Sequence, residues 1–375
     1  MTPTAAAPPV CSYLETVGRT PLVRLSERSL PAAARHATVL AKLEMANPGG
    51  SLKDRIALTI IERAEARGEI APGRNTIVDF TSGNTGIGYA MVAAAKGYRC
   101  IIIMPKRAAM RERYMICRLF RAEVRLWNPA LGVPGVTEYV KQLVRENPEL
   151  WWANQMGNDD NPQAHASTTA PEIWAQTEGR IDYFIAGLGT GGCLAGVGAF
   201  LKEKNPAIKI IAVEPSNCRV HVGGGHDPHS IVGIGTGVHS SFLSGAELPA
   251  EALSDLPRGV IDEWGHVSSE EAVGAARRLA ATEGMMVGPS SGAVIEYALR
   301  VAARPEARDK TIVAMCASHA IRYTSHPLWG EVAAEADVAL PAGEPPCVDE
   351  AAPIMLWSSD SGKDGAPHLS LSAGE

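Results

Sequence analysis

Residues 76–88, with the sequence TIVDFTSGNTGIG, decide the fold. The first five are mostly β-branched or apolar and predict a buried strand, the polar and glycine-containing residues after Phe80 predict a tight turn, and residues 87–96 carry a helical pattern. The same alternation recurs along the chain, which predicts βαβ units around parallel sheets and an α/β fold class. Further strands are predicted at 38–44, 100–104, 123–127, 181–186, 208–213 and 311–316, and further helices at 56–67, 111–121, 194–204, 269–282 and 291–302.

The composition and charge of the chain argue against several classes of protein. With 375 residues, 46% of them apolar, the chain is long enough for two domains of about 150 residues each. A net charge of -6 without a block of Lys or Arg argues against a nucleic-acid binder. No apolar run approaches the roughly 20 residues of a membrane span, and the N-terminal residues lack the pattern of a secretory signal. We therefore expect a soluble, cytoplasmic protein without a membrane or nucleic-acid partner.

The cysteines do not indicate a metal or a disulfide framework. There are seven, an odd number, and they are scattered without CxxC or Cys/His pairs. We expect no metal site. The segment 216–256 is rich in Gly, His and Ser and shows little periodicity, so an ordered loop near a site or an interface is predicted there.

Two polar loops follow predicted strands, where open parallel sheets bind ligands. The loop 81–88 places hydroxyls, an amide and free N–H groups at a helix start, which suits a carboxylate, although a simple N-cap with turn glycines is equally compatible. The loop 187–193, GLGTGGC, lets several backbone N–H groups converge on an anion, and the absence of GxxxxGK(S/T) favours a single phosphate monoester over an ATP-type P-loop. By itself a glycine-rich turn is weak evidence.

Lys53 and Ser318 are the remaining candidates. Lys53 stands at a helix start, where the macrodipole, with Arg55 near it, would lower its pKa and favour the neutral amine that forms a Schiff base. A solvated lysine is the ordinary alternative. Ser318 leaves a predicted buried strand and would face a ligand nitrogen or, more simply, cap the following turn.

Together and in this order the motifs resemble the cysteine synthase and cystathionine β-synthase branch of the fold type II pyridoxal-phosphate (PLP) enzymes, closest in pattern to cysteine synthase (O-acetylserine sulfhydrylase). The resemblance runs from about Ser12 to Val332. Its motifs are GRTPLV at 18–23, NPGGSLKDR at 47–55, TSGNTGIG at 81–88, Asn154-Gln155, residues 162–174, GLGTGGC at 187–193, Val213 to Ser216, Gly233 to Gly235, Ser290 to Gly292 and the Ser318 loop.

The resemblance assigns each loop a role. It implies that Lys53 carries PLP as an internal aldimine and acts as the base at Cα, that Asn84 bonds the 3′-oxygen of PLP, and that Ser318 faces the pyridine nitrogen. The phosphate would be bound by Gly189, Thr190, Gly191, Gly192 and Cys193, and the substrate by Thr81, Ser82, Thr85, Gln155 and Gly233. Cys193 departs from the threonine usual in the family, and Ala317, Ala320 and Ile321 stand where Pro, Gly and Glu are usual.

The implied reaction is β-replacement on an activated serine, in the simplest case O-acetylserine plus sulfide giving cysteine and acetate through an aminoacrylate. Alternatives are another nucleophile with a cystathionine, cyanoalanine or diaminopropionate-type product, a serine or threonine dehydratase, and a non-catalytic homologue that binds serine acetyltransferase. The resemblance also implies a homodimer. We expect a large PLP-binding domain from 1–51 and 164–340, a small mobile domain at 52–163 that closes over substrate, and a poorly ordered tail at 341–375.

Overall fold

The computed structural model describes residues 10–243 and 259–339. Residues 1–330 form one compact unit, and residues 331–375 form a second unit, of which only the part in helix α10 (Gly330–Ala339) is described. The tail predicted at 341–375 lies outside the described residues. In the part of the chain that is described, no helix combines the length and the apolar character needed to cross a bilayer.

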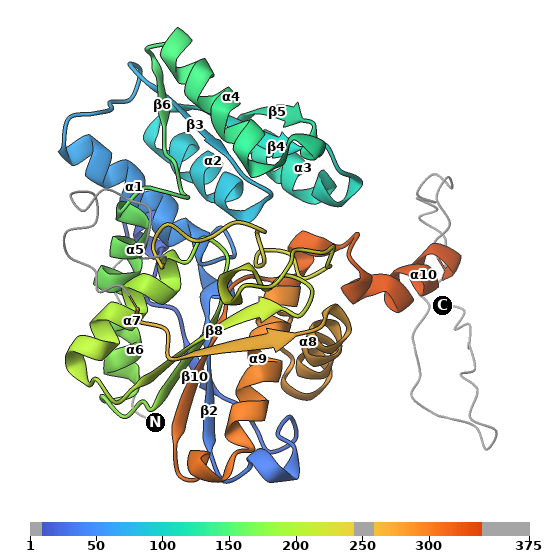
Figure 1. The fold of residues 1–375 in the computed structure, drawn as a ribbon. Coiled ribbons are helices and arrows are strands. Elements are labelled where there is room, and N and C mark those ends of the chain that lie inside the picture. Colours follow the sequence, from blue (N-terminus) through green and yellow to red (C-terminus); the bar gives the residue numbers. More distant parts are fainter. Residues whose placement is uncertain (1–9, 244–258, 340–375) are drawn as a thin grey trace, which may run out of the picture. The chain divides into compact units, whose positions relative to one another are not determined.

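Two sheets form the framework of residues 1–330 (Figure 1). The six-stranded sheet has the order β1-β2-β10-β7-β8-β9 and the four-stranded sheet the order β5-β4-β3-β6. Every strand pair is parallel except β1 with β2, which confirms the predicted α/β class. The strands are β1 Leu22–Arg24, β2 Thr38–Leu43, β3 Thr76–Phe80, β4 Arg99–Pro105, β5 Glu123–Trp127, β6 Leu150–Trp152, β7 Tyr183–Gly187, β8 Lys209–Pro215, β9 Glu263–Val267 and β10 Thr311–Cys316.

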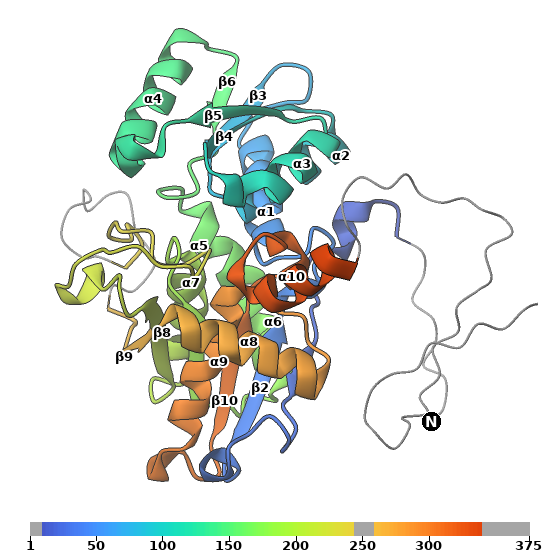
Figure 2. The same ribbon diagram turned by 90° about the vertical axis from the view of Figure 1, so that its right-hand side faces the viewer.

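Helices cover both faces of the six-stranded sheet, because alternate residues of a strand point to opposite faces. In β10, Ile312 and Ala314 pack with α8 and α9, whereas Val313 and Met315 pack with α6 and α7. Figures 1 and 2 show these two helix layers. The helices before α10 are α1 Lys53–Ala66, α2 Asn84–Lys96, α3 Arg111–Leu119, α4 Gly132–Glu146, α5 Asp160–Ala164, α6 Ala170–Gln176, α7 Gly192–Lys204, α8 Ser269–Glu283 and α9 Pro289–Ala302.

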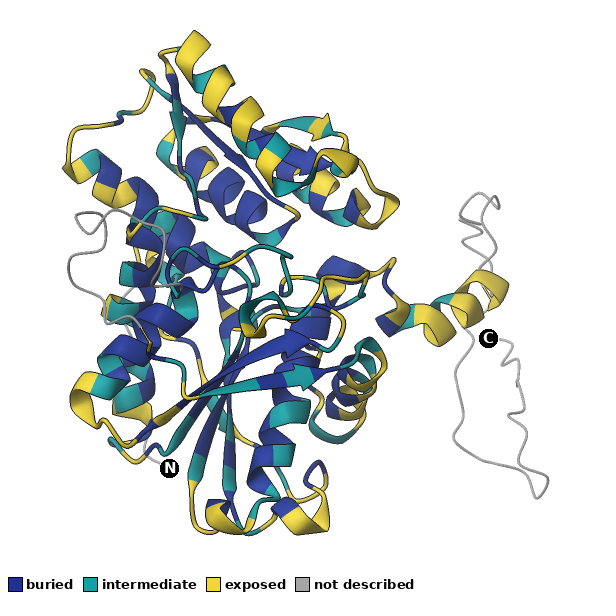
Figure 3. Ribbon diagram, viewed as in Figure 1, coloured by how far each residue is buried: buried dark blue, intermediate teal, exposed yellow. Residues whose placement is uncertain are grey.

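The four-stranded sheet is built in the same way. Ile77 and Ile102 pack with α1 and α2, while Val78 and Ile103 face the other side with residues of α4. All five residues of β3 are buried, as Figure 3 shows for the centre of the sheet. Such double coverage explains why these strands read as continuous apolar runs.

The two sheets come from different parts of the sequence, while the predicted division into two domains stays a prediction. All strands of the four-stranded sheet lie between residues 52 and 163, and all strands of the six-stranded sheet lie outside that range. Closure of the smaller part over substrate stays a prediction. The predicted loop at 216–256 is described up to residue 243, and this part contains a short 3-10 helix at Val220–Val222 and an isolated bridge between Cys218 and His226.

Candidate active site

Lys53 and Ser318 lie side by side at the carboxyl end of β10. Two backbone hydrogen bonds join their loops: Leu52 N–H donates to the Ala317 carbonyl (2.9 Å), and His319 N–H donates to the Gly50 carbonyl (3.2 Å). Gly50 has φ +80°, and a Cβ there would lie 3.0 Å from Nε of Arg322, so glycine is required where the chain turns into α1. Lys53 is the first residue of α1, as the sequence predicts.

The Lys53 amine is available for reaction. Burial lowers its pKa from 10.5 to about 8, while the nearby Cys193 acts in the opposite direction. The predicted contribution of Arg55 was wrong, because its guanidinium is held in buried ion pairs with Glu44 and Glu172, both at 2.7 Å. Lys42 is bound to Glu172 at 2.7 Å. Among the described residues, Lys53 has no ion pair.

Asn84 and Ser318 meet at one hydroxyl. Asn84 Nδ2 donates to Oη of Tyr323 (2.7 Å), and Oγ of Ser318 shares a hydrogen bond with the same oxygen (2.9 Å). Nη1 of Arg322 donates to Oδ1 of Asn84 (3.0 Å), which fixes the orientation of the amide. The side chains that the resemblance assigned to the 3′-oxygen and to the pyridine nitrogen of PLP therefore both hydrogen-bond to Tyr323.

The predicted carboxylate site is assembled from β3, α2 and the loop after β6. Thr85 Oγ1 donates to Oε1 of Gln155 (2.5 Å), and Gln155 Nε2 donates to the carbonyl of Phe80 (3.1 Å). Thr81 Oγ1 accepts from Gly83 N–H at 3.1 Å. Ser82 is exposed on the same loop.

The glycine-rich loop is packed so closely that side chains cannot fit. A Cβ on Gly191, whose φ is +91°, would lie 2.1 Å from Oγ of Ser240, and a Cβ on Gly192 would lie 2.1 Å from Oδ1 of Asn161. α7 begins at Gly192, and its cap residue, Gly191, has no side chain that could accept a hydrogen bond. The cap residue therefore offers no side-chain acceptor to the first N–H groups of the helix. This backbone arrangement, with the positive end of a helix dipole, suits the phosphate that the resemblance assigns to this loop, and we call the loop the predicted phosphate cradle.

Asn161 and Gly233 connect this loop to the rest of the site. Asn161 Nδ2 donates both to the Gln155 carbonyl (2.8 Å) and to Oγ1 of Thr190 (3.1 Å), while its buried Oδ1 has no hydrogen-bond partner among the described residues. A Cβ on Gly189 would lie 2.7 Å from the Gly233 carbonyl. Burial raises the pKa of the Cys193 thiol to about 12, so it is neutral near pH 7.

Three positioning residues were not assigned roles from the sequence: Tyr323, Arg322 and Arg113. Arg113 is 2% exposed, its carbon chain is the nearest neighbour of a Cβ built on Gly83, and its guanidinium stacks 5.1 Å from the Tyr323 ring. Nη2 donates to the Ala109 carbonyl, but Nε and Nη1 have no hydrogen-bond partner within the described part of the chain. One signal in the sequence could have indicated Arg113. It is a charged residue on the side of the predicted helix that also carries the apolar Met110 and Ile116.

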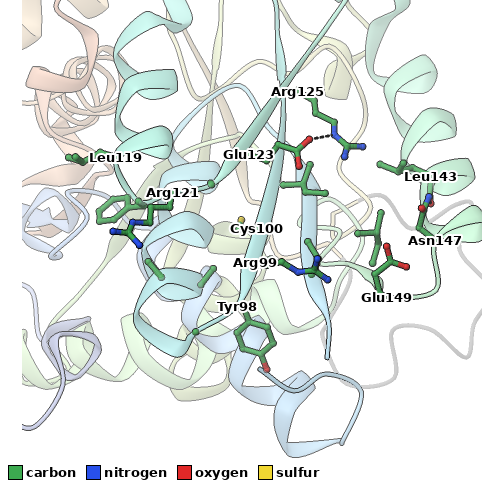
Figure 4. A pocket seen from close by; sticks show the side chains of 18 residues that line it. Tyr98, Arg99, Cys100, Leu119, Arg121, Glu123, Arg125, Leu143, Asn147 and Glu149 are labelled. Carbon is green, nitrogen blue, oxygen red and sulfur yellow. Dashed lines mark hydrogen bonds and ion pairs between the residues drawn. The ribbon is translucent and has the colours of Figure 1, made fainter. Parts of the chain in front are cut away.

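One cavity, of about 820 Å³, lies away from these residues. Figure 4 shows its lining, which includes Arg99, Glu123 and Leu150. Arg99, Glu123 and Leu150 are the first residues of β4, β5 and β6, so this cavity is at the amino ends of the strands. The predicted site residues are at the opposite, carboxyl ends, where parallel sheets bind ligands.

The residues fit a phosphorylated aldehyde. The cradle suits a phosphate monoester, the weakly basic Lys53 amine suits an aldehyde, and the carboxylate site completes a place for an amino acid. Lys53 Nζ and Cys193 affect each other's pKa, so the amine lies close to the start of α7.

Comparisons with known proteins agree. The profile of the family described as "Pyridoxal-phosphate dependent enzyme" matches residues 13–317. "Cysteine synthase 3" of Caenorhabditis elegans is 40% identical over 318 residues, which are 85% of this chain and 89% of that protein. "Cysteine synthase" of Staphylococcus aureus is 41% identical over 325 residues, 86% of this chain and 98% of that protein. The crystal structure of an O-ureido-L-serine synthase matches with a TM-score of 0.79 at 38% identity, covering 87% of this chain and 96% of the other.

These matches confirm the resemblance inferred from the motifs, including the fold type II class. They extend over nearly the whole described unit and include both sheets. The chain belongs to the pyridoxal-phosphate dependent enzyme family and is an enzyme of the cysteine synthase type, with pyridoxal phosphate as its cofactor.

Proposed function

We propose that this enzyme converts O-acetylserine and sulfide to cysteine and acetate by β-replacement. The C–O bond at the β-carbon breaks, acetate leaves, and sulfide forms the new C–S bond. The observation that carries the proposal is the Lys53 amine, which has a lowered pKa and interacts electrostatically with Cys193 of the glycine-rich loop, while the residues before it are hydrogen-bonded to the Ser318 loop. The relatives named cysteine synthase support the choice of substrates.

Lys53 would hold the aldehyde of the cofactor, and the backbone of Gly189–Cys193 would hold its phosphate. Asn84 and Ser318 would hold its ring. When bound, the cofactor supplies an electron sink for the pair left after removal of the α-proton. Nζ of Lys53 would accept that proton. Thr81, Ser82, Thr85 and Gln155 would hold the substrate carboxylate, and Ser318, a neutral hydroxyl, would leave the ring nitrogen unprotonated, which favours elimination at the β-carbon.

The buried guanidinium of Arg113 favours a second candidate substrate. A buried charge without a carboxylate partner is costly, and an anionic ligand would relieve that cost. Arg113 lies against Gly83 of the carboxylate loop, so it would suit a substrate with an anionic leaving group, such as O-phosphoserine. The products would then be cysteine and phosphate.

A substrate panel tests both candidates. O-acetylserine, O-phosphoserine and serine are each incubated with sulfide, cyanide or homocysteine, and products are identified by mass spectrometry. Cysteine formed from O-acetylserine with sulfide, and lost in Lys53→Ala, is the expected result. Keto acid formed equally fast without a nucleophile would indicate a dehydratase, and a protein that lacks the cofactor absorbance band would indicate a non-catalytic homologue.

Arg113→Met separates the two leaving groups. If Arg113 binds phosphate, kcat/KM for O-phosphoserine falls by at least about tenfold, as expected from loss of a charge-assisted hydrogen bond of about 1.5–3 kcal/mol, and that for O-acetylserine changes little. Equal losses for both substrates would show that Arg113 only supports Tyr323.

Formation of a homodimer, docking of serine acetyltransferase and closure of residues 52–163 over substrate are further proposals from the resemblance.

A further inference from the structure

The loop after β8 brings one cysteine and two histidines together. Cys218, His226 and His229 each offer one ligand atom, and these atoms all lie within 4.8 Å of one another. Cys218 is buried, His229 is half-buried and His226 is exposed. An isolated bridge pairs Cys218 with His226, and Nδ1 of His226 is 3.1 Å from Sγ of Cys218. The cluster thus combines a thiol with two imidazoles in one small volume.

His229 has one buried ring nitrogen without a hydrogen-bond partner among the described residues. Its Nε2 is 3.0 Å from the Gly235 carbonyl, and a carbonyl only accepts hydrogen bonds, so Nε2 carries the proton. In the neutral ring Nδ1 is therefore an acceptor, and this buried atom has no hydrogen-bond partner among the described residues. A histidine that ligates a metal has the same arrangement, with its other ring nitrogen donating to a backbone carbonyl.

We propose that Cys218, His226 and His229 bind a transition-metal ion of the zinc type. Thiolate and imidazole are the ligands that Zn²⁺ takes in proteins, and three protein ligands leave one position of a tetrahedron for water or another small ligand. The spacing, one cysteine followed by histidines eight and eleven residues later, does not match the paired CxxC pattern, which is why the sequence alone did not indicate the site.

The loop has the freedom to close on an ion. Sulfur and nitrogen ligands of one Zn²⁺ are roughly 3.5 Å apart, given bond lengths of about 2.3 and 2.05 Å, so the widest pair must move inward by about 1 Å. His226 is the residue placed to do so. It is exposed and follows Gly223, Gly224 and Gly225, and a Cβ added to Gly223 or Gly225 would meet no atom within 4 Å.

The metal site touches the phosphate cradle through two hydrogen bonds. His229 Nε2 donates to the Gly235 carbonyl, and Gly235 N–H donates to the Leu188 carbonyl at 3.0 Å. Leu188 precedes Gly189, the first residue of the predicted phosphate cradle. An ion at Cys218 would therefore fix the loop that borders the cofactor, and we expect it to raise the melting temperature of the holoenzyme by binding only the folded state.

Metal titration of the holoenzyme tests the proposal. The holoenzyme is treated with a chelator, desalted and titrated with ZnCl₂, and bound zinc is measured by elemental analysis. We expect one equivalent per chain. Cys218→Ser and His226→Gln should each weaken binding by at least about tenfold, since loss of even an outer-shell partner costs that much. In wild type, CoCl₂ should add a sulfur-to-cobalt charge-transfer band to the cofactor spectrum, and Cys218→Ser should lose it.

Matched controls separate this site from incidental binding. Cys11→Ser removes an exposed cysteine outside the cluster, and His36→Gln removes a histidine whose Nε2 also lies 3.0 Å from a backbone carbonyl. Both should bind zinc as wild type does and keep the zinc-dependent rise in melting temperature. Circular dichroism of each variant checks its fold. Binding of well under one equivalent by the wild type, or equal binding by the cluster variants and the controls, would overturn the proposal.

Discussion

Two lysines lie near the site, and their partners decide which one is free to react. Lys42 is fully buried and donates to Glu172, to Gln176 and to the Thr20 carbonyl. Lys53 is half-buried, and its pKa is lowered by burial without a carboxylate to restore it. A lysine held by a carboxylate is a poor nucleophile, so attachment of the cofactor is expected at Lys53.

The pH dependence of cofactor capture tests this difference. Only the neutral amine reacts, so the rate at which the apoenzyme takes up pyridoxal phosphate should rise with pH and level off above pH 8, the approximate pKa of Lys53. The rate at about pH 9 should exceed that at about pH 7 by roughly tenfold. Stopped-flow absorbance measures the rate, and borohydride reduction with peptide mapping locates the label. A rate that keeps rising to the ordinary lysine pKa of 10.5, or a label on Lys42, would contradict the assignment.

Tyr323→Phe tests whether one hydroxyl positions both Asn84 and Ser318. Its removal leaves two site groups without that partner, so the free energy of unfolding should fall by about 1–3 kcal/mol and cofactor affinity by about tenfold. Tyr98→Phe is the matched control, because the buried Tyr98 donates to Glu65 far from the site. It should lower stability and leave the cofactor dissociation constant unchanged. If both variants bind the cofactor as wild type does, Tyr323 has no positioning role.

At the scale of elements, long periodic segments were predictable and short or irregular ones were not. The strands β3, β4 and β10 are mostly apolar, β5 alternates charged with apolar residues, and the predicted bounds of all four agree with the structure to within one residue. Helix α4 was missed because Gly132, Pro134 and Gly135 in its first turn read as a loop, although proline is tolerated there. β9 was missed because its residues include Glu263, Gly265 and His266, and only its pairing with β8 makes it a strand.

The candidate site follows the same rule. Loops between a predicted strand and a predicted helix were found, because the residues on either side of the motif predict the local structure. Tyr323, Arg322 and Arg113 were not assigned, because their roles depend on contacts between segments more than 200 residues apart, such as Asn84 with Tyr323. The Cys218 cluster is hidden for a different reason: its three residues are close in sequence, but they lie in a loop whose lack of periodicity does not predict that they meet.

Gly191→Ala tests the packing of the phosphate cradle. Alanine at φ +91° carries a backbone cost of about 1–2 kcal/mol, and its Cβ would also lie 2.1 Å from Oγ of Ser240. Gly284→Ala, at the end of α8, is the control, because φ there is +68° and a Cβ would meet nothing within 4 Å. In denaturant unfolding, the backbone cost should lower the free energy of unfolding of both variants. Only Gly191→Ala should lose more than that and bind the cofactor less tightly, and equal behaviour of the two would mean that the cradle is not closely packed.

At the scale of the whole molecule, a buried charge network ties the start of α1 to distant segments. Arg55 pairs with Glu44 after β2 and with Glu172 in α6, and Glu172 also accepts from Lys42. Arg55 is two residues after Lys53, so the network holds the start of α1, with the predicted catalytic Lys53, against the six-stranded sheet. Burial raises the pKa of Glu172, but hydrogen bonds from Arg55 and Lys42 outweigh this effect and lower it to about 2. Breaking such a pair from one side leaves an uncompensated buried charge, which costs about 3–5 kcal/mol.

Two buried carboxyl groups act on stability in the opposite direction. Burial raises the pKa of Asp54 and of Asp79 from 3.8 to about 7, although Arg322 opposes the shift at Asp54 and hydrogen bonds from Gln155 and Trp152 oppose it at Asp79. Between pH 3.8 and about 7 these two groups bind more protons in the folded protein than in the unfolded chain. Their contribution to the free energy of unfolding should therefore fall as pH rises through that window, whereas His165, whose pKa burial lowers well below 6.5, contributes in the opposite direction. Glu172 adds stability above its ordinary pKa of 4.5 that is lost as pH falls toward 2.

Asp79→Asn isolates one of these contributions. The amide is neutral at every pH, so the contribution of Asp79 disappears and the stability of the variant relative to the wild type should rise with pH between 3.8 and about 7. Its oxygen can keep the hydrogen bonds from Trp152 Nε1 and Phe80 N–H, but its NH₂ group cannot accept from Gln155 N–H, which adds a pH-independent loss of about 1–3 kcal/mol. Denaturant midpoints measured across the window give both quantities. Asp309→Asn, at an exposed position with φ +59° that asparagine tolerates, should keep the wild-type slope. If Asp79→Asn also keeps it, Asp79 is ionised throughout the window, and its three donors, rather than burial, set its charge.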